Sequence, residues 1–267
     1  MLSKLLKQDY LSTRRLFLPS YLVFAIIFLL NKIMFELSGN LSTPTKVVDV
    51  VTIIFMTLYI IAIVAIYVVT YVFICMHFYR TVAGEQGYLT HTLPVKTSTI
   101  INSKLLNSVF WQVISSALII LSLFIMFYGH THGYTFGELW GEYLNFIKVE
   151  MYMDPGSFNL LLSVTFLISL FSGPLMFFCS IAIGHLFNKH KVGGAIVAYI
   201  GIYMVLQMFA TMILFISGFF SIVWSNTTNF ADMYSKSMLY SLILSVISSI
   251  VFYFITVYIF RRRVNLE

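Results

Sequence analysis

The stretch from Tyr79 to Lys104, YRTVAGEQGYLTHTLPVKTSTIINSK, is a polar interruption between two strongly apolar runs. Gly84 and Gly87 allow the chain to turn, and Pro94 ends any helix that precedes it. The next helix can begin after the Thr-Ser pair that follows, because either hydroxyl can cap its free N–H groups. The pattern predicts a short helical segment held in a loop between two long apolar helices.

Apolar runs long enough to cross a bilayer occur six times in the chain. Hydrophobic residues make up 60% of the 267 residues, charged residues 10%, and the mean hydropathy is +0.92, which excludes an ordinary soluble domain. A crossing helix needs about 20 such residues. We therefore expect an all-α integral membrane protein with six transmembrane helices in a single domain, residues 1–267. The runs are Leu16–Phe35, Val50–Phe78, Leu105–Tyr128, Phe158–Phe187, Val192–Val223 and Met238–Phe260.

The basic residues indicate how these helices are oriented. Of the 16 Lys and Arg residues, 12 lie in the amino-terminal segment, the second and fourth loops and the carboxy-terminal tail, which share one face. The positive-inside rule then predicts that both termini and the 79–104 loop are cytoplasmic. The net charge of +6 follows from this topology and from contact with anionic lipid, so it does not indicate nucleic acid. The first run lacks a small-residue cleavage site and is expected to be retained.

Two segments outside the spans have a pattern of their own. Residues 1–15 are basic and amphipathic, with Lys4 and Lys7 among Leu2, Leu5 and Leu6. This pattern favours a helix lying in the cytoplasmic interface, and a frayed tail is the alternative. The external loop, residues 129–157, carries aromatic residues that favour a short helix at the outer interface. It also contains His130 and His132. Two histidines without a third ligand are weak evidence for a metal, so no metal site is predicted.

The middle of the 79–104 loop carries a small apolar surface. Tyr88, Leu89 and Leu93 can share one face of a short helix, whereas the polar residues between them point elsewhere. An apolar surface exposed to the cytosol favours a partner that covers it.

The residues from Gly84 to Lys96, followed by Ser103-Lys104-Leu105-Leu106, resemble the membrane subunits (permeases) of type-2 ABC exporters. In that family a similar pattern between the second and third spans forms the coupling helix that docks on the ATPase subunit. The segment from Lys4 to Tyr10 also looks like the family's interfacial helix. The resemblance implies a docking set for the ATPase: Gly84, Glu85, Gly87, Tyr88, Leu89, Thr90, His91, Leu93 and Pro94.

The same resemblance implies partners and a function. The chain is expected to pair with a second permease copy or a homologous permease and with ABC ATPase subunits, which hold the ATP and Mg²⁺. It would export an amphipathic or hydrophobic cargo (a peptide, antibiotic or lipid) across a plasma membrane, most simply that of a bacterium. No cofactor is expected in this chain.

The chemistry that the sequence lacks agrees with this expectation. None of the 14 glycines is followed by lysine, so there is no phosphate-binding P-loop, and the common hydrolase motifs are absent. The chain is therefore not expected to be an enzyme. Of the Asp, Glu, Lys and Arg residues, only Lys32 falls inside the six runs, close to the end of the first, which indicates that the driving force comes from outside the membrane. A membrane-embedded peptide sensor or immunity protein, or an ion-coupled secondary transporter, remains an alternative.

A cargo cavity would be lined by residues near the middle of the spans. Uncharged, aromatic and methionine side chains there suit a hydrophobic cargo. The predicted lining residues, chosen by their position in the second and fifth spans, are Tyr59, Tyr67, Tyr203, Gln207 and Met208.

Overall fold

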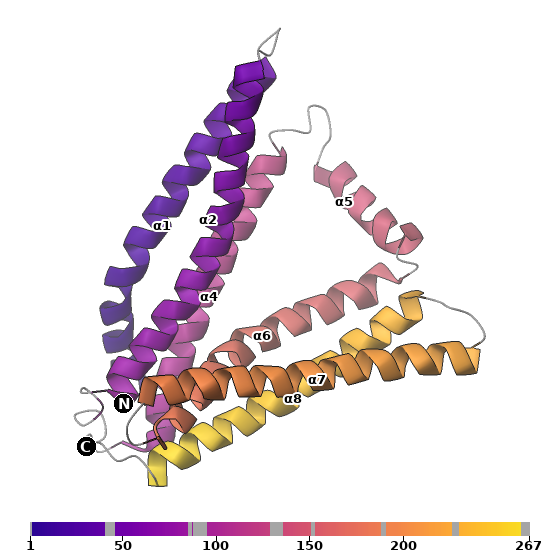
Figure 1. Cartoon of the computed structure of the whole chain (residues 1–267). Helices are drawn as coiled ribbons and strands as arrows, with labels where there is room; N and C mark the ends of the chain where they lie inside the picture. The colour runs from indigo at the N-terminus through magenta and orange to yellow at the C-terminus, as the bar shows by residue number, and fades with distance from the viewer. Residues whose placement is uncertain are drawn as a thin grey trace. The chain divides into compact units, whose positions relative to one another are not determined.

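The computed structural model describes residues 2–40, 46–84, 87, 95–128, 136–150, 153–187, 191–225 and 230–262. Over these residues the regular structure is entirely helical, which confirms the all-α prediction. Six of the described helices are long and apolar enough to cross a membrane, so the chain is a multi-pass membrane protein. The elements (Figure 1) are α1 (Leu2–Asn40), α2 (Lys46–Phe78), the π-helical turn η1 (Tyr79–Ala83), α4 (Thr97–Tyr128), α5 (Phe136–Asn145), the π-helical turn η2 (Phe146–Glu150), α6 (Pro155–Gly184), α7 (Lys191–Ser225) and α8 (Phe230–Arg262).

The helices extend beyond the apolar runs that predicted them. α1 is continuous from Leu2 to Asn40, with Pro19 inside it, so residues 2–15 are helical but are not a separate element. Their position at a membrane interface stays a prediction. α7 likewise extends past the end of its apolar run and continues through Gly218 to Ser225.

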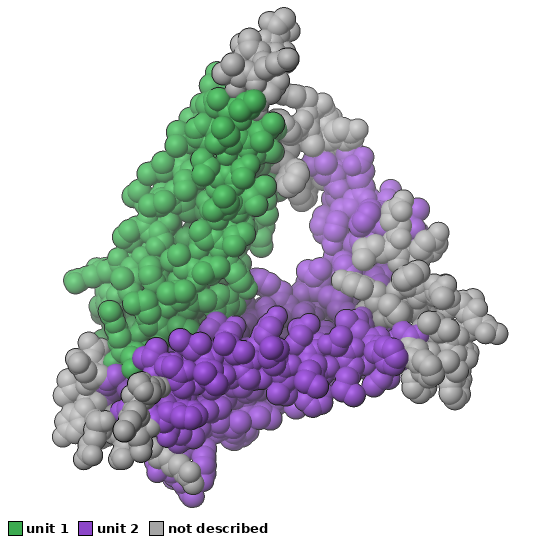
Figure 2. All heavy atoms as spheres, in the orientation of Figure 1, with its two compact units in different colours: residues 1–80, 99–132 green, residues 81–98, 133–267 purple. Residues whose placement is uncertain are grey.

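The chain divides into two compact units (Figure 2). Unit 1 contains residues 1–80 and 99–132, and unit 2 contains residues 81–98 and 133–267. Each unit takes three of the six long helices: α1, α2 and α4 in unit 1, and α6, α7 and α8 in unit 2. The single domain over residues 1–267 stays a prediction.

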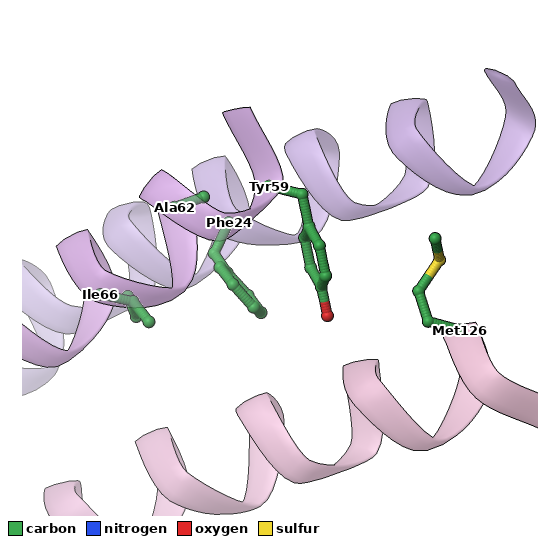
Figure 3. Packing of buried hydrophobic residues seen from close by; sticks show 5 residues of the cluster. All are labelled: Phe24, Tyr59, Ala62, Ile66 and Met126. Atoms are coloured by element: carbon green, nitrogen blue, oxygen red, sulfur yellow. The ribbon is translucent and has the colours of Figure 1, made fainter. Parts of the chain in front are cut away.

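The core of unit 1 brings its three helices together. Phe24 from α1, Tyr59, Ala62 and Ile66 from α2, and Met126 from α4 form a buried cluster (Figure 3). The two α2 residues Ala62 and Ile66 are four apart and therefore lie on one face of that helix. The small side chain of Ala62 lies between those of Tyr59 and Ile66 on α2, which favours close packing of α1 against α2.

In unit 2, α6 packs against both α7 and α8. α6 begins where the Asp154 carboxylate accepts a hydrogen bond of 2.8 Å from the Ser157 N–H, with Pro155 in the first turn. At its other end, a Cβ added to Gly184 would lie 2.5 Å from the backbone nitrogen of Ala195. Glycine at this position therefore lets the ends of α6 and α7 approach closely.

The short helix predicted within residues 129–157 is present as α5, and its position at the outer interface stays a prediction. The rings of Trp140 and Tyr143 are tilted against each other by 34°, with their centroids 5.2 Å apart, and the Tyr143 hydroxyl donates to Asn159 Oδ1 at 2.6 Å. Gly141 has nothing within 4 Å of a built Cβ, so no close neighbour within the described residues requires glycine at this position. His130 and His132 lie outside the described residues.

Candidate functional site

The predicted docking loop is described at its two ends. After η1, the Gly87 N–H donates to the Gly84 carbonyl at 2.8 Å, which closes a turn where the glycine pair predicts one. The remaining docking residues, Glu85, Tyr88, Leu89, Thr90, His91, Leu93 and Pro94, lie outside the described residues. The chain re-enters a helix at Thr97, one or two residues before the start that the Thr-Ser pair predicts.

The predicted cavity residues have different environments. Tyr59 is only 5% exposed, and its hydroxyl lies 2.8 Å from the Ser122 hydroxyl, so it packs inside unit 1. Tyr67 is 51% exposed and its hydroxyl is 3.3 Å from that of Tyr71. In unit 2, Tyr203 and Met208 are 52% and 66% exposed. Gln207 is also exposed. Their role in lining a cavity stays a prediction.

Unit 1 contains a buried ionic group that the sequence analysis did not single out. Asp9 of α1 receives hydrogen bonds from the Lys104 ammonium and, at 2.8 Å, from the Ser103 hydroxyl, both on α4. The Nε2 atom of His77, in the last turn of α2, lies 3.4 Å from Asp9 Oδ1. The side chains of Asp9 and Lys104 are only 7% and 8% exposed. We call these four residues the Asp9 cluster.

A line of buried hydrogen bonds continues from the Asp9 cluster along unit 1. The Trp111 indole N–H of α4 donates to the Thr13 hydroxyl of α1 at 2.8 Å. Farther along, the Ser115 hydroxyl lies 2.9 Å from that of Tyr21 on α1 and 2.8 Å from that of Thr70 on α2. We call these five residues the polar seam. They join all three helices of unit 1.

Two buried hydroxyl groups of unit 2 bond within their own helices. Ser180 donates to the carbonyl of Met176 at 2.7 Å, and Thr256 donates to that of Phe252 at 2.6 Å, in each case within the same helix. These bonds satisfy the hydroxyl without joining two helices. The sequence did not indicate that buried hydroxyl groups join different helices in unit 1, whereas these two in unit 2 bond within one helix.

One signal in the sequence points to the polar seam. On α4 the buried polar residues recur every three to four positions, which places them on one helix face: Ser103, Lys104, Asn107, Ser108, Gln112, Ser115 and Ser122. Apolar residues such as Val113, Ile120 and Leu121 occupy the exposed positions between them. A membrane helix with its polar face inward is expected to bond to other helices through that face.

The chemistry of the Asp9 cluster is that of a structural ion pair. One carboxylate is opposed by one ammonium, and a hydroxyl and an imidazole complete its surroundings, so the pair carries no net charge when both partners are ionised. Within the described residues, no group of three or more His, Cys, Asp or Glu side chains could hold a metal ion. The arrangement therefore fixes helices to one another.

No family model, curated protein or solved structure matches the chain.

Proposed function

We propose that the chain is the permease subunit of an ATP-driven exporter of the ABC type. The observation that carries the proposal is the segment Gly84–Lys96, with Ser103-Lys104-Leu105-Leu106 after it, placed between the second and third long apolar helices. The segment resembles the coupling helix of type-2 ABC exporters. This resemblance identifies an ATPase subunit as the partner that would cover the predicted apolar surface of Tyr88, Leu89 and Leu93.

In this proposal, ATP binding closes two ATPase subunits and displaces the loop between α2 and α4. The displacement shifts a cavity, shared with a second permease copy, from one side of a bacterial plasma membrane to the other. Both termini are cytoplasmic. An amphipathic or hydrophobic cargo suits the uncharged and aromatic residues predicted to line the cavity.

The experiment is a purification of the tagged chain from its native membrane in mild detergent. Wild type is compared with Leu89→Asp and Leu93→Asp, and with Ser98→Asp, which adds the same charge just after the segment, in the first turn of α4. We expect an ATP-binding subunit to copurify with wild type and with Ser98→Asp, and to be lost from the other two. Wild type that is recovered alone, from membranes whose other complexes stay intact, would contradict the proposal and favour a peptide sensor or a secondary transporter.

A further inference from the structure

The Asp9 cluster lies where the docking loop leaves and re-enters the membrane-spanning helices. His77 is in the last turn of α2, directly before the loop, and Ser103 and Lys104 are in the second turn of α4, at the loop's end. Asp9 contacts residues on both sides. A single carboxylate of α1 thus joins α1 to the two helices on which a moving loop would act.

Because the Asp9–Lys104 pair is buried, neither charge can easily replace its partner with water. Asp9 and Lys104 are almost completely removed from solvent, and a buried charge that loses its partner carries the full penalty of desolvation. A slide of α1 along α4 would separate the two charges, because their bond needs contact between the carboxylate and the ammonium. Buried ionic pairs of this kind can fix the register of packed helices.

The polar seam extends the same connection along the helices. The Thr13–Trp111 and Tyr21–Ser115–Thr70 hydrogen bonds join α1, α2 and α4 farther from the loop. When α2 and α4 move, α1 is therefore expected to move with them, because hydrogen bonds connect the three helices at more than one position along their length.

We propose that Asp9 is a positioning residue that fixes α1 to both ends of the docking loop, so that α1, α2 and α4 move as one body when the loop is displaced. The inference rests on the proposed function for the source of the displacement. The fixing of α1 is a property of the chain alone and can be measured without a nucleotide.

The experiment uses spin labels in the full chain, purified with its ATP-binding partner and reconstituted in lipid. Cys75 and Cys179 are replaced by Ala, and labels are placed at two exposed positions of unit 1, Gln8 on α1 and Leu121 on α4. We expect one narrow distribution of label distances in the wild-type background, unchanged by Mg²⁺-ATP with orthovanadate. Asp9→Asn should give a distribution about twofold broader, because α1 gains other orientations.

Two further variants keep the test decisive. Lys7→Gln removes an exposed charge from the same helix and should leave the distribution narrow. The double variant Asp9→Asn/Lys104→Gln leaves no unpaired buried charge, so it should fold even where the single variant does not, and it should also broaden the distribution. A narrow distribution in the double variant, or a wild-type distance that changes with nucleotide, would overturn the inference.

A second pair of labels separates this inference from the proposed function. Labels at Leu121 in unit 1 and Met204 in unit 2 report whether nucleotide binding changes the conformation of the chain. We expect the distance between them to change on addition of Mg²⁺-ATP with orthovanadate. If it does not change and no ATP-binding subunit copurifies, the proposed function fails, while the nucleotide-free comparison of Asp9→Asn with wild type still decides the role of Asp9.

Discussion

The ammonium of Lys104 donates a hydrogen bond to the carboxylate of Asp9, although the two residues are 95 positions apart in the sequence. The pair is buried between the amino-terminal part of α1 and the beginning of α4. A long-range buried pair restricts α1 and α4 to arrangements that keep the two charges in contact.

Removal of one charge from this pair should lower the free energy of unfolding far more than removal of both. Lys104→Met leaves the Asp9 carboxylate buried without its ammonium, and we expect a loss of about 3–5 kcal/mol in the free energy of unfolding. The double variant Asp9→Leu/Lys104→Met should lose much less, because no buried charge remains. Thermal or denaturant unfolding of the purified protein in detergent measures both changes.

Lys32 provides the matched control. Its ammonium lies 3.1 Å from the Glu36 carboxylate one turn along α1, and the Glu36 side chain is exposed. Lys32→Met should change stability by less than about 1 kcal/mol, because the exposed Glu36 carboxylate is not left buried when its partner is removed. If Lys104→Met behaves like Lys32→Met, the buried pair does not hold α1 to α4.

The polar seam predicts a difference between two neighbouring serines of α4. The Ser115 hydroxyl contacts Tyr21 and Thr70 on the other two helices, whereas Ser116 donates to the Val113 carbonyl of its own helix at 3.0 Å. Ser115→Ala should lower stability by about 0.6–2 kcal/mol, the range for hydrogen bonds between membrane helices. Ser116→Ala should have almost no effect. Equal unfolding midpoints for the two variants would show that the seam contributes nothing.

The helices of this protein were predictable from sequence, whereas the partners of their polar residues were not. Apolar runs identify spans because a bilayer requires a fixed length of apolar helix. Asp9 and Lys104 lie just outside those runs, so they were interpreted as charges at the cytoplasmic surface. Their pairing depends on which helices are neighbours, and hydropathy carries no information about that. The inward polar face of α4 was visible in its spacing, but its partners on α1 and α2 were not.

Tyr59 illustrates the same limit for the predicted cavity. Its position in the middle of a span is correct, yet its ring packs against Phe24 and Phe28, with centroid distances of 6.4 and 6.0 Å. Position along a span does not determine which way a side chain faces. The place of Tyr59 along its helix was therefore predictable, whereas its neighbours were not.

The contact between α6 and α7 predicts a strong difference between two glycines. A methyl group at Gly184 would lie within 2.5–2.7 Å of three atoms of Ala195, two of them in the backbone, so the helices would have to move apart. We expect Gly184→Ala to destabilise the protein by about 1–3 kcal/mol through overpacking. Gly201→Ala on α7 is the control, since nothing lies within 4 Å of its built Cβ. A Gly184→Ala protein that unfolds at the same temperature as Gly201→Ala would exclude this close contact.

The stability of the α6–α7 turn should depend on pH through His185. This residue follows the end of α6, outside the spanning segment, and is 6% exposed, beside the Phe260 ring. Burial, with a smaller contribution from the positive charge of Lys191, lowers the pKa of the imidazole below its ordinary value of 6.5. In the folded protein His185 therefore stays neutral at a pH where the unfolded chain already binds a proton.

The sign of the effect follows from that difference. As the pH falls through about 6.5, the unfolded state takes up a proton that the folded state does not, so the free energy of unfolding decreases. The decrease ends once the pH is below the lowered pKa of the folded protein. His185→Gln removes the titrating group. The unfolding free energies of wild type and His185→Gln are measured from pH 8 to pH 5, about the range over which a histidine titrates. As the pH falls, wild type should therefore lose stability relative to His185→Gln. A difference that stays constant with pH would show that His185 titrates alike in both states and is not held neutral by the fold.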